Sequence, residues 1–220
     1  MIRHLPNFLT CCNLAVGTFG VFHLVKFGTI HPLWFVGISA LFDFLDGFAA
    51  RMLRVKSELG KQLDSLSDLV SFGLLPTVYL MSMADVYWYP PILVSVFSAV
   101  RLAIFNLDDG QEDRFIGLPT PANAIMITSL SFSGIVFDDV LIGVVSAVSA
   151  FLLVAKVPML ALKFKSWGWK GNEFRWILIL MIVLGMIVLK TVFIPFIIPF
   201  YIVLSLIDFL GSKFMNRNSV

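Results

Sequence analysis

Residues 32–53 read PLWFVGISALFDFLDGFAARML, an apolar stretch that carries two carboxylates, Asp43 and Asp46, in its second half. A helix needs roughly 20 predominantly apolar residues to cross the hydrocarbon core of a bilayer, and this stretch has that length. We therefore expect a transmembrane helix here. Its acidic residues are unusual, because an Asp at mid-membrane costs roughly 2.5–3.5 kcal/mol on insertion scales.

The rest of the chain has the same apolar character. Of its 220 residues, 59% are hydrophobic and 14% are charged, whereas a soluble domain is about 45–50% apolar and about 25% charged. This composition argues against a soluble globular enzyme, a disordered tail and a nucleic-acid-binding protein. We expect an all-α, multi-pass integral membrane protein with about eight spans, at residues 6–27, 32–53, 63–83, 86–107, 121–137, 140–162, 174–189 and 192–210.

The basic residues predict the orientation of these spans. Lys and Arg gather in the connections 51–61 and 156–175 and near both chain ends, and only Lys26 and Lys190 fall on the opposite side. Basic connections lie on the cytoplasmic side, so eight spans with both termini in the cytoplasm fit best. A count of six, which would merge segments in the second half, is the alternative. The connections are short, which predicts a single membrane domain over residues 1–220.

Four acidic residues flank the first basic connection at helical spacing. Asp43 and Asp46 are three residues apart, and Asp64 and Asp68 are four apart, so each pair shares one helix face. The connection between them lets the two helices run antiparallel, which predicts that the pairs converge. Carboxylate oxygens are the ligands that Mg²⁺ and Mn²⁺ prefer, so this arrangement predicts a divalent-cation site.

Small residues accompany the carboxylates. Gly47 and Ala50 follow Asp43 by one and two turns, and Gly60 precedes Asp64 by one turn. They predict a groove in which a ligand approaches the backbone, with Arg51 and Ser57 at its cytoplasmic rim, where they can bind phosphate oxygens. The alternative is that the carboxylates form ion pairs with Arg51, Arg54 and Lys61 and only cap helix ends.

The spacing of these residues resembles a family signature. Asp43-x-x-Asp46-Gly47-x-x-Ala50-Arg51, eight further residues, and Gly60-x-x-x-Asp64-x-x-x-Asp68 are similar to the motif of the CDP-alcohol phosphotransferases, which move a phospho-alcohol group from a CDP-linked donor to a hydroxyl and release CMP. The resemblance implies a six-helix core, here with two further helices: a catalytic core over residues 1–160 that contains the motif 43–68, then a basic loop and two helices over 161–220.

The resemblance also implies roles for individual residues. Two divalent cations, Mg²⁺ or Mn²⁺, would be held by the four carboxylates, and Asp68 would be the catalytic base. The segment Pro6-Asn7-x-x-Thr10 is similar to the family's donor-binding segment. The residues expected to bind the CDP moiety are Asn7, Thr10, Gly47, Ala50, Arg51, Ser57 and Gly60.

The segments that flank the motif indicate the acceptor. Residues 68–76, 101–106 and 115–122 resemble the phosphatidylserine synthase branch, although Ile104 stands where that branch often has a second Arg. The resemblance implies CDP-diacylglycerol and L-serine as substrates, a homodimer, and a prokaryotic cell (inner) membrane with the site facing the cytoplasm. Serine carries a carboxylate that needs a cation, which Arg101 can supply, with Ser71 and Asn106 as polar neighbours.

Three alternatives stay open. Arg101 can instead extend to lipid phosphates. The acceptor can be glycerol 3-phosphate or an inositol phosphate, although a phosphorylated acceptor favours a pocket with several basic residues, and this part of the chain offers mainly Arg101 and Arg114. The acidic residues can also line a divalent-cation channel or transporter, although a pathway needs polar residues across the full membrane depth.

Overall fold

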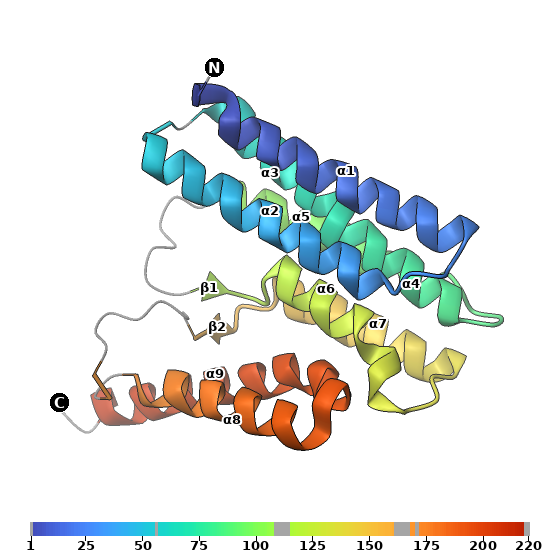
Figure 1. Ribbon diagram of the computed structural model, residues 1–220. Coiled ribbons are helices and arrows are strands. Elements are labelled where there is room, and N and C mark those ends of the chain that lie inside the picture. The colour runs from blue at the N-terminus through green and yellow to red at the C-terminus, as the bar shows by residue number, and fades with distance from the viewer. Residues whose placement is uncertain (1, 56, 108–114, 161–167, 170–171, 218–220) are drawn as a thin grey trace.

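The computed structural model describes residues 2–55, 57–107, 115–160, 168–169 and 172–217, and these are mostly helical (Figure 1). The α-helices are α1 (Leu5–Lys26), α2 (Pro32–Leu53), α3 (Glu58–Asp68), α4 (Leu75–Met83), α5 (Ile92–Leu107), α6 (Thr120–Thr128), α7 (Asp139–Val154), α8 (Glu173–Leu189) and α9 (Ile194–Arg217). A π-helix (Leu69–Leu74) joins α3 to α4, and 3-10 turns cover Ile2–His4, Leu130–Ser133 and Lys190–Phe193. Strands β1 (Phe115–Ile116) and β2 (Pro158–Met159) pair in antiparallel fashion.

The described helices have the length and composition of a membrane protein. Four stretches are long and apolar enough to cross a bilayer: Leu5–Lys26, Pro32–Leu53, Glu58–Met83 and Glu173–Leu210. Helices α5 and α7 are apolar but shorter. The prediction of a helical membrane protein is therefore confirmed, and the small sheet formed by β1 and β2 is the one departure from all-α structure within the described residues.

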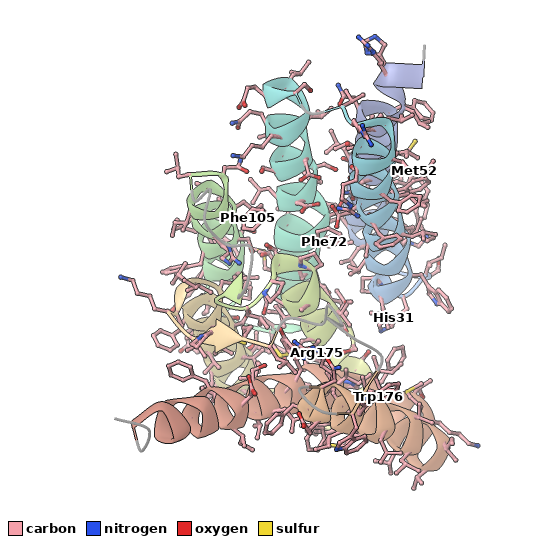
Figure 2. The ribbon with its side chains drawn as sticks, turned by 90° about the vertical axis from the view of Figure 1, so that its left-hand side faces the viewer. His31, Met52, Phe72, Phe105, Arg175 and Trp176 are labelled. Atoms are coloured by element: carbon pink, nitrogen blue, oxygen red, sulfur yellow. The ribbon has the colours of Figure 1, made fainter. Side chains whose placement is uncertain are left out.

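Helices α1, α2 and the α3–α4 rod form the half of the molecule that contains the acidic motif (Figure 1). Gly20 in α1 allows a close approach, because a Cβ atom there would lie 2.8 Å from the Cβ atom of Phe35 in α2. Phe35 packs in a buried cluster with Val36, Phe72 and Leu75. Figure 2 shows the labelled Phe72 between Met52 and His31, which mark the opposite ends of this half.

The ends of α2 have clear local causes. Pro32 is its first residue, where the missing N–H costs nothing, and the ring nitrogen Nδ1 of His31 accepts a hydrogen bond from the Leu33 N–H at 3.3 Å. The helix ends at Arg54, whose φ of 52° lies in the left-handed region. This turn leads the chain directly toward Ser57, the N-cap of α3.

The rod from Glu58 to Met83 is continuous but not uniform. Between Asp68 and Leu75 the chain adopts the wider π-helical turn, which proteins use in short pieces, frequently at functional sites. Sequence periodicity did not predict this π-helix. It begins at the residue that follows Asp68 and includes the fully buried Ser71 and Phe72.

Two of the expected spans are shorter as helices because of proline and glycine. The span expected at 86–107 is helical only from Ile92, since Pro90 and Pro91 lack the N–H groups that would extend α5 toward its N-terminus. The span expected at 121–137 is an α-helix only to Thr128. A 3-10 turn follows and ends at Gly134, whose φ is 72°.

The span expected at 140–162 is also shorter, because its last part forms the small sheet. Helix α7 ends at Val154, and Pro158 and Met159 then pair with Ile116 and Phe115. Gly117 permits this crossing, because its φ is +80° and a Cβ atom there would lie 2.6 Å from the Leu153 carbonyl oxygen. Residues 161–167 and 170–171 of the expected basic loop lie outside the described residues.

Helices α8 and α9 form a hairpin that lies obliquely to the other helices in both views (Figures 1 and 2). It packs through Leu178, Tyr201 and Leu204 against Leu118 and Met159. Polar contacts add to this: the Tyr201 hydroxyl donates to the Leu160 carbonyl at 2.9 Å. The hairpin therefore attaches at α6 and the small sheet, away from the acidic motif.

Candidate active site

Three carboxylates meet between α2 and α3. Asp43 from α2 and Asp64 and Asp68 from α3 each offer an oxygen, and these three oxygens lie within 4.8 Å of one another. Asp68 is buried, and Asp43 and Asp64 are half-buried. One oxygen of Asp64, Oδ1, is buried and has no hydrogen-bond partner among the described residues. Three clustered anionic side chains with an unpaired buried oxygen fit a hard divalent cation, which would neutralise their mutual repulsion.

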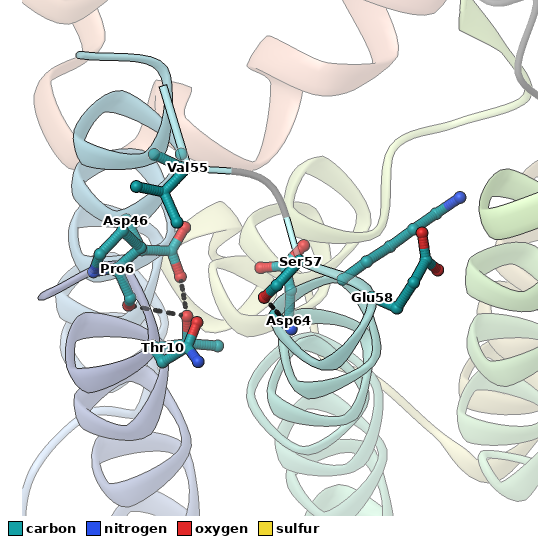
Figure 3. A pocket seen from close by; sticks show the side chains of 12 residues that line it. Pro6, Thr10, Asp46, Val55, Ser57, Glu58 and Asp64 are labelled. Carbon is teal, nitrogen blue, oxygen red and sulfur yellow. Dashed lines mark hydrogen bonds between the residues drawn. The ribbon is translucent and has the colours of Figure 1, made fainter. Parts of the chain in front are cut away.

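Asp46, the fourth predicted carboxylate, is held separately by α1. It is buried, and its Oδ2 atom lies 2.6 Å from the Thr10 hydroxyl, which donates a hydrogen bond to it (Figure 3). The same hydroxyl lies 3.0 Å from the Pro6 carbonyl, one turn earlier in α1. Thr10 therefore links the N-terminal part of α1 to α2.

Helix α1 also reaches Asp68. The side-chain amide of Asn13, which is fully buried, donates from Nδ2 to Oδ1 of Asp68 at 3.1 Å. One turn away, the Ser67 hydroxyl donates to the Thr10 carbonyl at 3.1 Å. Asn13 was absent from the predicted site. In the structure the buried residues of α1 recur every three or four positions, at Pro6, Thr10, Asn13, Gly17, Gly20 and His23, but apolar residues lie on all sides of α1 and do not mark this face in the sequence.

A cavity of about 590 Å³ adjoins the carboxylates. Asp64 belongs both to the carboxylate cluster and to the cavity wall, and Asp46 lines the cavity as well. Figure 3 shows Thr10 and Asp46 on one side and Ser57 and Asp64 on the other. Six of the seven residues predicted to bind the donor line it: Asn7, Thr10, Gly47, Ala50, Ser57 and Gly60.

The predicted small residues Gly60 and Gly47 differ in how much space surrounds them. A Cβ atom at Gly60 would lie 3.0 Å from the Ser57 Oγ and 3.1 Å from the Asn7 Oδ1, so this position is crowded. At Gly47 the nearest atom would be Nη1 of Arg51, at 3.4 Å. Arg51, the seventh predicted donor-binding residue, is exposed and lies beside Gly47 rather than in the cavity lining.

Ser57 has a structural role in addition to lining the cavity. It is the N-cap of α3, and its Oγ accepts a hydrogen bond from the Gly60 N–H at 3.0 Å. Capping by serine satisfies an N–H group that has no partner inside the helix. The cap sets the start of α3 and so the register of the carboxylates that follow.

Lys61 lines the cavity and was not among the predicted site residues. Its Nζ atom donates to the Asn106 carbonyl at the end of α5, at 2.5 Å. Asn106 in turn donates from Nδ2 to the Ser65 hydroxyl at 2.8 Å. These two contacts tie the end of α5 to α3, and they place a cation at the cavity wall.

The three predicted acceptor residues lie in different surroundings. Ser71 is fully buried and donates to the Asn13 carbonyl at 3.1 Å, and Asn106 is engaged with Ser65. Arg101 is only 6% exposed, and its Nε atom is buried with no hydrogen-bond partner in the part of the chain that the structure describes. Its guanidinium carbon lies 5.5 Å from the centroid of the Phe105 ring. The burial of Arg101 disfavours the alternative in which it extends to lipid phosphates.

The comparisons with known proteins agree with this site. Residues 3–162 match the family described as CDP-alcohol phosphatidyltransferase. The chain is similar to a CDP-diacylglycerol–serine O-phosphatidyltransferase of Bacillus subtilis (strain 168), at 30% identity over 163 residues that cover 71% of this chain and 89% of that protein.

Two proteins with the same description are similar over shorter ranges. The one from Mycobacterium leprae (strain TN) is 32% identical over 140 residues, which cover 59% of this chain and 47% of that protein. The one from Helicobacter pylori (strain J99) is 31% identical over 129 residues, which cover 56% and 54%. The chain thus spans about half the length of these two relatives. Because the family match covers most of the sequence, including the acidic motif, the chain belongs to the CDP-alcohol phosphatidyltransferase family of enzymes.

Proposed function

We propose that the chain is a CDP-diacylglycerol–serine O-phosphatidyltransferase. It would transfer the phosphatidyl group of CDP-diacylglycerol to the hydroxyl of L-serine and release CMP, a step of phospholipid biosynthesis. The observation that carries the proposal is the position of Asp64, which belongs both to the carboxylate cluster and to a cavity large enough for a nucleotide. The relatives described as CDP-diacylglycerol–serine O-phosphatidyltransferases support serine as the acceptor.

The cation site would be formed by the motif carboxylates. We assign two divalent cations, Mg²⁺ or Mn²⁺, to Asp43, Asp46, Asp64 and Asp68. When bound, such cations neutralise the diphosphate and the departing CMP. The geometry of the oxygens supports this assignment for Asp43, Asp64 and Asp68, and the Thr10 hydrogen bond orients Asp46 toward the same cavity.

The donor would be bound by the residues of the cavity wall. Asn7 and Thr10 from α1 offer polar side chains, and Gly47, Ala50 and Gly60 leave room for the nucleotide to approach the backbone. Ser57, Arg51 and Lys61 would bind the diphosphate oxygens. Lys61 already lies in the wall, whereas Arg51 would extend from its position beside Gly47.

The reaction would be a direct attack by serine. The serine oxygen bonds to the phosphorus that carries the diacylglycerol group, the bond from that phosphorus to the CMP oxygen breaks, and Asp68 accepts the serine hydroxyl proton. Arg101 would bind the serine carboxylate. Its unpaired buried Nε atom supports this role, while Ser71 and Asn106 use their hydrogen bonds to hold the neighbouring helices.

The acceptor can be tested directly. Purified protein in detergent is given CDP-diacylglycerol with Mg²⁺ or Mn²⁺, and serine, glycerol 3-phosphate and inositol are supplied in parallel while CMP release is measured. We expect release with serine and none after chelation with EDTA. Release only with another alcohol would show a different acceptor within the same family, and divalent-cation flux in liposomes without CMP release would show a channel or transporter.

The membrane arrangement is part of the proposal. We propose eight spans, with both termini and the site on the cytoplasmic side of the inner membrane of a prokaryotic cell. Residues 1–220 would form one domain, with a catalytic core over 1–160 and a basic loop with two helices over 161–220. The basic residues Arg51, Arg54 and Lys61 at the site end support this orientation. Reporter fusions at each connection and at the C-terminus test it.

We also propose that the protein is a homodimer, as the family resemblance implies. Light scattering after size-exclusion chromatography in detergent, with the detergent mass subtracted, distinguishes the dimer from the monomer. A monomeric mass with full serine-dependent activity would contradict the dimer and leave the proposed reaction intact.

A further inference from the structure

Asn13 is the feature from which we infer a further role in the site. Among the described residues, its amide is the only hydrogen-bond partner of the Asp68 carboxylate, with 3.1 Å between Asn13 Nδ2 and Asp68 Oδ1. Asn13 is fully buried, and Asp68 is 8% exposed. Water therefore has little access to replace this contact, and the orientation of the carboxylate depends on α1.

The position of Asn13 is itself fixed by contacts on both sides. Its backbone carbonyl accepts hydrogen bonds from the Ser39 hydroxyl of α2 at 3.4 Å and from the Ser71 hydroxyl at 3.1 Å. One turn further, Gly17 lets α1 approach the π-helix, because a Cβ atom there would lie 2.1 Å from Ser71 Oγ. The amide of Asn13 is therefore attached to a turn that cannot move away from Asp68 without breaking these contacts.

Asn13 is costly as a packing residue. Its Oδ1 atom is buried, and no residue that the structure describes forms a hydrogen bond with it. Buried side-chain polar atoms are normally paired, and an unpaired one needs an explanation. Leucine would have a similar volume and would leave no polar atom unpaired. The amide donor toward Asp68 supplies the reason for the polar side chain.

The chemistry of an amide suits this position. A Lys or Arg would neutralise Asp68 and compete with a cation for the carboxylate cluster. An amide donates a hydrogen bond and leaves the negative charge in place. It can thus fix the carboxylate while the cluster keeps the negative charge that attracts divalent cations.

We propose that Asn13 is a positioning residue, which holds Asp68 so that the carboxylate presents an oxygen to the cluster with Asp43 and Asp64. For the role of Asp68 in transfer, the inference rests on the proposed function. For the role of Asp68 in cation binding, it rests on the geometry alone. Asn13 itself touches neither substrate in this role.

The test compares Asn13→Leu, which removes the donor, with Asn13→Asp, which keeps the shape but replaces the donor by a carboxyl group. Thr77→Val is the matched control, because Thr77 is a buried polar residue that donates to the Gly73 carbonyl, outside the carboxylate cluster. Mn²⁺ binding is measured by electron paramagnetic resonance without substrate. The kinetic constants kcat and KM for CDP-diacylglycerol are measured per folded enzyme.

For Asn13→Leu we expect Mn²⁺ affinity and kcat each to fall about 10–100-fold, the range typical for residues that orient metal ligands, with KM for CDP-diacylglycerol little changed. Asn13→Asp is expected to lower kcat at least as much. Thr77→Val is expected to change neither the Mn²⁺ affinity nor kcat. A merely structural role would lower the thermal midpoint and the yield but leave Mn²⁺ affinity and kcat per folded enzyme unchanged, which would overturn the proposal.

Failure of both Asn13 variants to fold, with a folded Thr77→Val protein, would assign Asn13 to folding and would also overturn the proposal. The Mn²⁺ measurement separates this inference from the proposed function. If the wild-type protein uses an acceptor other than serine, the loss of Mn²⁺ affinity in Asn13→Leu is still expected.

Discussion

The hydroxyl of Thr10 in α1 donates a hydrogen bond to the Oδ2 atom of Asp46 in α2, at 2.6 Å. The two residues are 36 positions apart, and both are buried. The segment that begins the chain is thus part of the wall of the cavity that the acidic motif forms. A change in α1 is therefore expected to act on the motif itself.

Replacing Thr10 with Val tests this contact. Valine keeps the shape and removes the hydroxyl, so Asp46 loses the hydrogen bond that ties it to α1. We expect kcat/KM for CDP-diacylglycerol to fall about 10–100-fold. Thr10→Ser keeps the hydroxyl and is expected to stay close to the wild type. Equal kcat/KM in Thr10→Val and the wild type would show that the contact is not needed.

Asp68→Asn tests the base. The amide keeps the size of the side chain but cannot accept the serine proton, so we expect CDP-diacylglycerol binding to be retained and transfer to be lost. Binding is measured by equilibrium dialysis with labelled donor, and transfer by CMP release. Asp208→Asn in α9 is the control for a carboxylate outside the motif. Turnover retained in Asp68→Asn would remove Asp68 from the base role.

Gly17→Ala tests the close approach of α1 to the π-helix. The added Cβ atom would lie 2.1 Å from Ser71 Oγ and 2.9 Å from Ser71 Cα, so a helix must shift. We expect a loss of about 1–3 kcal/mol in the free energy of unfolding, seen as a lower thermal midpoint.

Gly37→Ala is the matched control for Gly17→Ala. Gly37 lies within α2, and apart from the neighbouring backbone of this helix no atom of the described residues would lie within 4 Å of a Cβ atom there. Because alanine favours the helix by up to about 1 kcal/mol over glycine, its midpoint is expected to stay or rise. Equal effects of the two substitutions would contradict the proposed packing.

His31 predicts a pH dependence at the opposite end of the molecule. Burial lowers the pKa of its imidazole from the ordinary value of 6.5. As pH falls below 6.5, the unfolded chain takes up a proton at His31 and the folded protein does not, so the folded state loses stability. Protonation would also remove the acceptor that caps α2 at Leu33.

We expect the thermal midpoint of the wild type to fall more than that of His31→Asn between about pH 7.5 and 5.5, since asparagine keeps a capping oxygen and does not titrate. Thermal melts of both proteins in the same detergent and buffer series measure this. A parallel decline in the two proteins would show that other groups cause the pH dependence.

The spacing of the acidic residues predicted the convergence of Asp43, Asp64 and Asp68, although Asp46 lies outside this cluster. Asp64 and Asp68 are one turn apart on α3, and the short connection returns them to Asp43, so convergence follows from helix geometry. The cavity residues Gly47, Ala50 and Gly60 were predicted because they are small and lie one or two helical turns from Asp43 or Asp64. The sequence pattern was sufficient wherever polar residues were rare enough to stand out from an apolar background.

Other features were not predictable in this way. The contact between Asn13 and Asp68 depends on the rotation of α1, and α1 carries apolar residues on all sides, so its sequence does not mark one inward face. The π-helix after Asp68 has no composition signal of its own. The early end of α7 depends on pairing between Phe115–Ile116 and Pro158–Met159, which are far apart in the sequence.

The π-helix divides the rod from Glu58 to Met83 into two parts, and it changes the direction in which the side chains of the second part point relative to those of the first. Each residue of an α-helix turns the chain by about 100°, and a π turn holds about one residue more, so the part that begins at Leu75 is rotated relative to the part that ends at Asp68. The part that begins at Leu75 can therefore bury Leu75, Tyr79 and Leu80 in the interior, independently of the direction in which α3 points its carboxylates. One continuous helix thereby meets two separate demands, the convergence of carboxylates along one part of its length and apolar packing along the other.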